Sequence, residues 1–100
     1  MIITKTENNG VISLALAGRL DTVTSSLLAN ELDSLFEEKI EKLVLDFLKI
    51  DYMSSAGLRV IINAQKKVQS LGIKMEITNV HESIKSIFDI TGFTKILTII

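Results

Sequence analysis

Residues 43–77, LVLDFLKIDYMSSAGLRVIINAQKKVQSLGIKMEI, contain the two changes of hydrophobic period that decide the fold. The opening run, Leu-Val-Leu-Asp-Phe, is short and apolar, which is typical of a strand buried on both faces. Apolar residues then recur at helical spacing between Leu58 and Leu71, and Gly72 stands where a left-handed residue ends a helix. Alternation with period two returns over 73–77. A strand, a helix and a strand in this order predict two parallel strands joined by a crossover.

The N-terminal side of this unit adds a hairpin and a helix. Residues 2–7 and 11–17 predict two antiparallel strands around Asn8-Asn9-Gly10, whose residues tolerate the positive φ of a tight turn. Apolar residues at helical spacing then predict an amphipathic helix from about Thr24 to Lys39. Its candidate N-caps are Asp21, Thr22 and Thr24.

The C-terminal side adds a third helix and a last strand. Asn79, followed by Glu82, resembles a capping box, so we expect a helix from there to Gly92. Residues 96–100 predict a last short strand. The predicted fold class is α/β, with a mixed, mostly parallel sheet of four to five strands, an N-terminal β-hairpin and packed α-helices. We expect a single domain over residues 1–100.

The composition limits the classes of protein to which the chain can belong. Its 100 residues are 47% hydrophobic with a formal net charge of -1, which excludes a disordered chain. Because it has no cysteine, disulfide scaffolds, thiolate metal sites and cysteine nucleophiles are excluded. The near-neutral charge does not indicate a basic surface for nucleic acid. No stretch approaches the roughly 20 apolar residues of a membrane span. The absence of cysteine suits a cytoplasmic location, and we expect a monomer because no long apolar patch is evident.

The sequence offers few catalytic residues. His81 is the only histidine, and it lies at a predicted helix start, where a surface or capping role is expected. The GxGxxG, HExxH and GxSxG motifs and the P-loop are absent. We therefore expect no enzymatic activity, no cofactor and no metal site.

Residues 50–59, between the buried strand and the second helix, differ from the rest of the chain. In open α/β sheets, ligands and modifications gather at this carboxyl edge of the strands. Ser54 and Ser55 can cap the helix, and the small Ala56 and Gly57 leave the backbone of its first turn open. A phosphate on Ser55 would lie beside free N–H groups and the positive end of the helix dipole. Alternatively, Ser54 is only an N-cap and Ser55 an ordinary residue of the first turn.

Four pieces of the sequence together resemble the STAS domain of the anti-sigma factor antagonist (anti-anti-sigma factor) type. The most specific is Asp51–Val60, DYMSSAGLRV, which is similar to the family's D/S-S-S/A-G-L segment at the start of its second helix. Gly18–Asp21 is similar to the G-x-L/I-D signature, Leu43–Asp46 to the third strand, and Thr91–Phe93 to the turn after the third helix. The resemblance covers essentially all of the chain and implies a STAS-type fold.

The resemblance implies a switch in protein binding. In this family the unphosphorylated antagonist binds an anti-sigma factor that is also a serine kinase, and the sigma factor is released. Phosphorylation by that kinase separates the complex, and a PP2C-type phosphatase restores it. The implied partners are therefore an anti-sigma factor serine kinase and a PP2C-type phosphatase, with no direct contact to nucleic acid or membrane.

The same resemblance assigns the site residues. Aligning the glycines puts Ser54 at the family's Asp and Ser55 at its first Ser, so Ser55 is the expected phosphate acceptor and Ser54 the second choice. Asp21 matches the signature Asp and is expected near Ser55, where its alternative role is helix capping. The expected partner-binding surface consists of Asp21, Thr22, Met53, Ser54, Ser55, Ala56, Gly57 and Arg59.

Two other functions stay open. One is a STAS module that acts as a scaffold in another signalling system, without regulation by phosphorylation. The other is a receiver domain phosphorylated on aspartate, which also has parallel strands. A receiver would not open with a hairpin, and Asp46 lies inside a predicted strand rather than at its end.

Overall fold

Strands and helices alternate along the chain from the first hairpin onward, as the hydrophobic periods predict. The computed structural model describes all residues, 1–100. None of its helices is long and apolar enough to span a bilayer. The elements are β1 (Ile2–Asn8), β2 (Val11–Leu20), α1 (Thr22–Leu35), β3 (Lys42–Met53), α2 (Ser55–Leu71), β4 (Lys74–Thr78), α3 (Glu82–Ile90) and η1, a 3-10 helix (Phe93–Lys95).

The four strands form one mixed sheet in the order β1-β2-β3-β4. β1 and β2 pair antiparallel through a turn in which Asn9 and Gly10 have φ of 51° and 82°, a conformation that suits these two residue types. β2 and β3 are parallel, and so are β3 and β4. The predicted hairpin and the predicted mixed, mostly parallel sheet are therefore confirmed.

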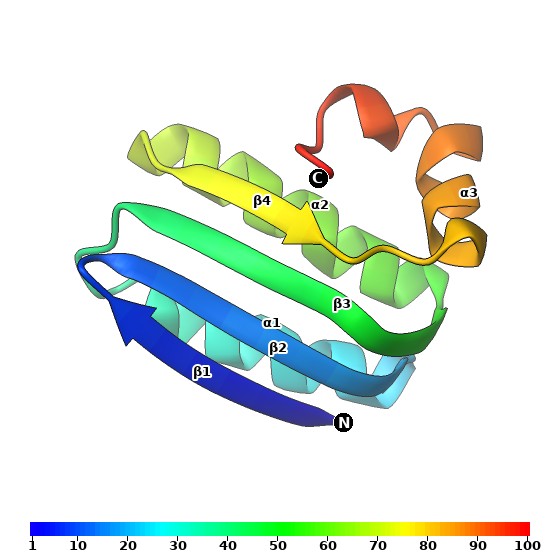
Figure 1. Cartoon of the computed structure of the whole chain (residues 1–100), viewed down its shortest axis with the longest axis horizontal. Helices are drawn as coiled ribbons and strands as arrows, with labels where there is room; N and C mark the ends of the chain where they lie inside the picture. Colours follow the sequence, from blue (N-terminus) through cyan, green and yellow to red (C-terminus); the bar gives the residue numbers. More distant parts are fainter.

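Two helices cover one face of the sheet. Figure 1 shows α1 and α2 side by side behind the strands, while α3 lies beyond the end of β4. The core between the layers holds 22 buried hydrophobic residues, among them Leu14, Leu45 and Ile77 of the sheet and Leu28 and Ile61 of the helices. Removing each such side chain from water contributes about 1.5–3 kcal/mol.

β3 is longer than the predicted strand Leu43–Phe47, because it continues through a bulge. The register of β3 against β2 is irregular beside Leu48, and the carboxylate of Asp46 accepts the Leu48 backbone N–H over 3.0 Å. The strand then continues to Met53, whose side chain turns back into the core. The segment predicted to join strand and helix is thus mostly strand and helix, with Ser54 alone between them.

α1 begins two residues earlier than predicted and ends at Leu35, short of the predicted Lys39. Of the three candidate N-caps, Asp21 is the one that caps the helix. Thr24 completes a reciprocal pair, because its hydroxyl accepts the Asp21 backbone N–H over 2.8 Å while its own N–H bonds to the Asp21 carboxylate.

The predicted capping box of Asn79 and Glu82 is wrong. α3 starts at Glu82 with His81 as the N-cap residue, and no side chain bonds across that cap. Asn79 has a φ of 57°, which is left-handed, whereas an N-cap needs an extended backbone. Its side-chain amide instead donates to the Asp46 carboxylate over 2.9 Å.

The predicted last strand over residues 96–100 is not formed. Gly92, with a φ of 80°, leads into η1, and Leu97 turns into the core. Only a single parallel bridge between Ile77 and Ile99 follows.

Candidate functional site

The first turn of α2 is joined to the end of β2. The backbone N–H of Ser54 donates to the carbonyl of Leu20 over 2.8 Å, and the Ser54 hydroxyl accepts the Gly57 N–H over 3.2 Å. Ser54 has an extended backbone, with φ of -85° and ψ of 173°, as an N-cap requires. The Ser54 hydroxyl therefore caps α2, while Ser55, the first helical residue, is exposed.

Gly57 permits this junction because it has no side chain. A Cβ built at Gly57 would lie 2.7 Å from Cγ and 2.9 Å from the carbonyl oxygen of Leu20. Both distances are shorter than van der Waals contact, so any larger residue would force the helix away from the strand. The glycine of the motif thus allows the start of α2 to pack closely against Leu20.

Asp21 lies at the adjacent helix start. Leu20 and Met53 are register partners in the parallel pair of β2 and β3, so the residues that follow them emerge side by side. The Asp21 carboxylate accepts the N–H groups of Val23 and Thr24 over 3.1 and 3.0 Å. The hydrogen bond from the Thr24 backbone, and then that from the Thr24 hydroxyl, hold the pKa of the Asp21 carboxyl below its ordinary value of 3.8.

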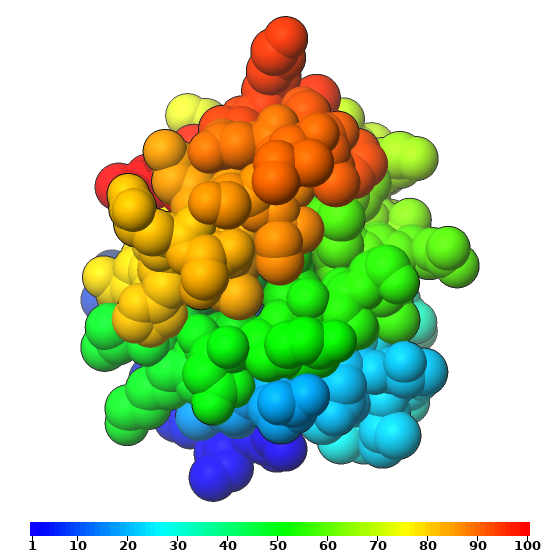
Figure 2. All heavy atoms as spheres, turned by 90° about the vertical axis from the view of Figure 1, so that its right-hand side faces the viewer, coloured from blue at the N-terminus to red at the C-terminus, as the bar shows by residue number.

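The predicted surface residues differ in their exposure. Thr22, Ser55 and Arg59 are exposed, and Asp21, Ser54 and Ala56 are half-buried. Met53 is only 4% exposed, and Gly57 is buried against Leu20. These two residues therefore lie beneath the exposed residues of the predicted surface. Figure 2 shows this end of the molecule, where the start of α1 (light blue), the β3–α2 junction (green) and α3 (orange) adjoin.

One feature of this end was not predicted from the sequence. The guanidinium of Arg19 lies 4.3 Å from the centroid of the Tyr52 ring. The two residues are register partners on β2 and β3, and both are exposed. Their contact depends on a register that lies beyond the β3 bulge, and no local sequence signal gives that register.

An open cleft of about 370 Å³ lies directly beside Ser55. It runs along α2 toward η1, and its two charged side chains, Arg59 and Lys66, are both basic. Three apolar side chains complete it together with two polar ones. The lining is Ser55, Leu58, Arg59, Ile62, Asn63, Lys66 and Phe93.

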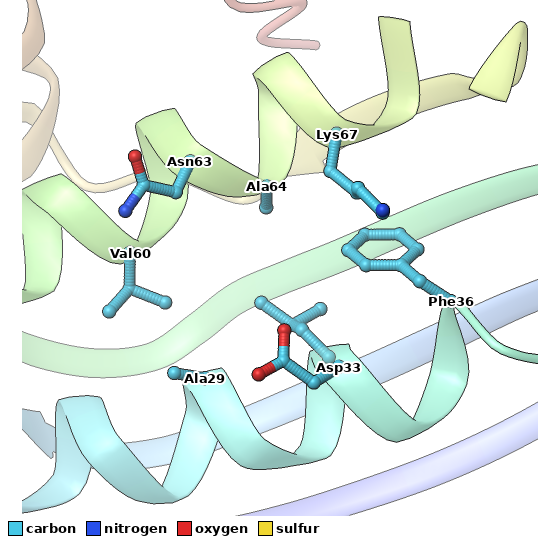
Figure 3. A pocket seen from close by; sticks show the side chains of 8 residues that line it. Ala29, Asp33, Phe36, Val60, Asn63, Ala64 and Lys67 are labelled. Atoms are coloured by element: carbon cyan, nitrogen blue, oxygen red, sulfur yellow. The ribbon is translucent and has the colours of Figure 1, made fainter. Parts of the chain in front are cut away.

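A second cavity, of about 320 Å³, lies between α1 and α2 (Figure 3). Val60 and Ala64 of α2 lie on one side of it and Ala29 and Asp33 of α1 on the other, and Lys67 lies over the Phe36 ring at one end. Asp33 points into the gap, but no residue of the serine turn reaches it. This cavity is a gap left by small side chains, separate from the site at Ser55.

The His81 side chain contacts a backbone group of β3. Its Nε2 lies 2.7 Å from the carbonyl oxygen of Leu48, at the β3 bulge. At the same bulge the Asp46 carboxylate accepts hydrogen bonds from the Leu48 backbone N–H and the Asn79 side-chain amide. In the structure no group of three or more His, Cys, Asp or Glu side chains is placed to hold a metal ion.

The chain matches a known family over nearly its whole length. The sequence pattern of the STAS domain matches residues 3–100. The chain belongs to the STAS domain family. It is 30% identical to the anti-sigma-B factor antagonist of Bacillus subtilis over 93% of this chain and 84% of that protein. It is 29% identical to the anti-sigma F factor antagonist of Paenibacillus polymyxa over 92% of this chain and 80% of that protein.

Solved STAS structures share the fold. An anti-sigma factor antagonist from Mycobacterium paratuberculosis superposes with a TM-score of 0.89 at 17% identity, over 98% of this chain and 83% of that one. SpoIIAA in its unphosphorylated form gives 0.83 at 12% identity, over 99% and 88%. The Bacillus cell fate determinant SpoIIAA in the phosphorylated form gives 0.80 at 11%, over 99% and 91%. At these identities the likeness shows the fold alone.

Proposed function

We propose that this STAS domain is an anti-sigma factor antagonist whose binding is switched by phosphorylation of Ser55. Unphosphorylated, it binds an anti-sigma factor that is also a serine kinase, and the sigma factor is released. The kinase transfers the γ-phosphoryl group of ATP to the Ser55 hydroxyl, and the complex separates. A PP2C-type phosphatase hydrolyses the phosphoserine and restores binding. The protein acts in the cytoplasm as a monomer, with no catalytic activity of its own.

The observation that carries this proposal is the different environment of the two serines. The Ser54 hydroxyl accepts the Gly57 N–H and its backbone N–H is bonded to Leu20. The Ser55 side chain is exposed and takes part in no hydrogen bond within the protein. A kinase can therefore reach Ser55 without breaking the helix start, which favours Ser55 over Ser54 as acceptor.

The charge and position of a phosphate at Ser55 suit a switch. A phosphoserine adds about -1.5 to -2 charges and a large hydrated group, which opposes burial in a protein interface. At the first turn of α2 the free backbone N–H groups and the helix dipole favour a negative charge. Phosphorylation would thus block a partner without unfolding the domain. The two SpoIIAA structures, one unphosphorylated and one phosphorylated, support the view that this fold tolerates both states.

The test is phosphorylation with a cognate anti-sigma kinase and ATP, read by intact mass. We expect one phosphate on the wild-type chain and on Ser54→Ala, and none on Ser55→Ala. Ser83 is a matched control, because it is another exposed serine in the first turn of a helix, so Ser83→Ala should be labelled like the wild type. Labelling of Ser55→Ala at the wild-type level would refute the proposal.

The second candidate is a constitutive STAS scaffold in another signalling system. The observation in its favour is the complete cap made by Ser54, which gives the serine segment a structural role without any phosphate. Under this alternative, Ser55→Asp would leave the affinity for a partner within about tenfold, roughly 1.4 kcal/mol. A larger loss favours the switch.

A further inference from the structure

The cleft beside Ser55 contains an unpaired guanidinium. Arg59 is exposed and takes part in neither of the two salt bridges of the structure, which join Lys5 to Glu38 and Lys42 to Glu76. No acidic side chain lines the cleft. The positive charge of Arg59 is therefore not neutralised by an ion pair, and its guanidinium N–H donors are free, on the same surface as the proposed phosphate acceptor.

The helix places this guanidinium within reach of Ser55. Residues four apart lie on one face of an α-helix, and a rise of 1.5 Å per residue separates the Cα atoms of Ser55 and Arg59 by about 6 Å along the axis. Long side chains on a helix lean toward its N-terminus, which directs Arg59 toward Ser55. Lys66 lines the same cleft, but its Cα lies about 16 Å from that of Ser55 along the axis. Of the two basic side chains of the cleft, Arg59 is therefore the one within reach of a group attached at Ser55.

We propose that Arg59 is the internal ligand of the phosphate on Ser55. This inference rests on the proposed phosphorylation of Ser55 and adds how the phosphorylated state is held. A guanidinium binds phosphate oxygens through two parallel N–H donors. An acidic group four residues before a basic one is also the favourable order on a helix. The phosphate and Arg59 would therefore form a pair on the surface of α2.

The pair gives phosphorylation a second effect on the partner-binding surface. Unphosphorylated, Arg59 is free to meet an acidic or carbonyl group of the partner. Once phosphorylated, Ser55 carries the new negative charge and also holds the guanidinium. One modification thus adds a group that repels the partner and withdraws a group that binds it.

The test uses full-length chain with phosphoserine introduced at position 55 during translation, so that no kinase is needed. The second pKa of the phosphate is measured by phosphorus NMR titration, with an ordinary value of about 6. We expect it to be depressed in the parent protein and to rise by about half a pH unit in Arg59→Gln. Lys66→Gln is the matched control, because it removes the same charge from the same cleft, and it should leave the value within about 0.1–0.2 units of the parent.

Two results would overturn the proposed pair of Arg59 and the phosphate. One is a second phosphate pKa in Arg59→Gln equal to that of the parent, and the other is an equal rise of this pKa in Arg59→Gln and Lys66→Gln. The second would mean that only the general positive field of the cleft acts on the phosphate. Because Arg59 is exposed, both unphosphorylated variants should melt at the parent temperature, which verifies folding. Failure here leaves kinase labelling of Ser55 unaffected, whereas failure of the proposed function appears in the labelling experiment.

Discussion

The backbone N–H of Ser54 donates to the carbonyl oxygen of Leu20 over 2.8 Å, which joins the start of α2 to the end of β2. The two residues are far apart in sequence, and the parallel pairing of β2 with β3 brings them together. As a result, the starts of α1 and α2 lie next to one another at one end of the sheet. The proposed acceptor Ser55 and the signature residue Asp21 occupy this end.

Gly57→Ala should destabilise the domain by about 1–3 kcal/mol, because the new methyl group would overlap Leu20. Urea unfolding measures the loss. In a Leu20→Ala background the cost of Gly57→Ala should be smaller, since the nearest side-chain atoms are gone and only the Leu20 carbonyl is still crowded. Equal costs in the two backgrounds would contradict the contact.

Ser54→Ala and Ser55→Ala should differ in stability although they are neighbours. Loss of the Ser54 cap should cost about 1 kcal/mol, whereas the exposed Ser55 should change stability by less than about 0.5 kcal/mol. Chemical unfolding of both variants at one pH separates them. The reverse order would mean that Ser55, and not Ser54, caps α2.

Asp21 should make stability depend on pH in the acid range. Its pKa is lowered in the folded state, chiefly by the Thr24 backbone hydrogen bond, so its contribution is complete above the unfolded-state value near 3.8. That contribution is lost as the pH falls through the lower folded-state pKa. Asp21→Asn keeps a capping oxygen without the charge, so it should be less stable than wild type near neutral pH and equal to it in strong acid. A difference that is constant from neutral to acid pH would contradict this role.

The carboxylate of Asp46 should stabilise the β3 bulge, because it accepts hydrogen bonds from Leu48 and Asn79. Asp46→Ala removes both and should cost about 1–2 kcal/mol. Asp46→Asn retains an acceptor oxygen and should lose less. Equal losses, measured by urea unfolding, would mean that charge rather than hydrogen bonding matters at the bulge.

The sequence predicts the elements well because their hydrophobic periods are local. The hairpin turn, the left-handed Gly72 and the Ser54 cap all depend on residues adjacent in the chain. The length of β3 could not be predicted, since the bulge shifts its alternation and the strand past Phe47 no longer has a regular period. The left-handed Asn79 was missed for a similar reason, because its partner is Asp46 on another strand.

The candidate site was predicted in part. The motif placed Ser54, Ser55 and Gly57 at a helix start, and the structure has them there. It could not show that Met53 faces the core, because that direction depends on the register after the bulge. The contact of Gly57 with Leu20 depends likewise on how two distant strands align.

The most direct test of the switch is the affinity of a cognate anti-sigma kinase for the chain with serine or phosphoserine at position 55. Isothermal titration calorimetry without ATP measures both forms under one condition. We predict that the phosphorylated form binds at least about a hundredfold more weakly, roughly 2.8 kcal/mol. Affinities within about tenfold of one another would contradict the switch and favour the constitutive scaffold.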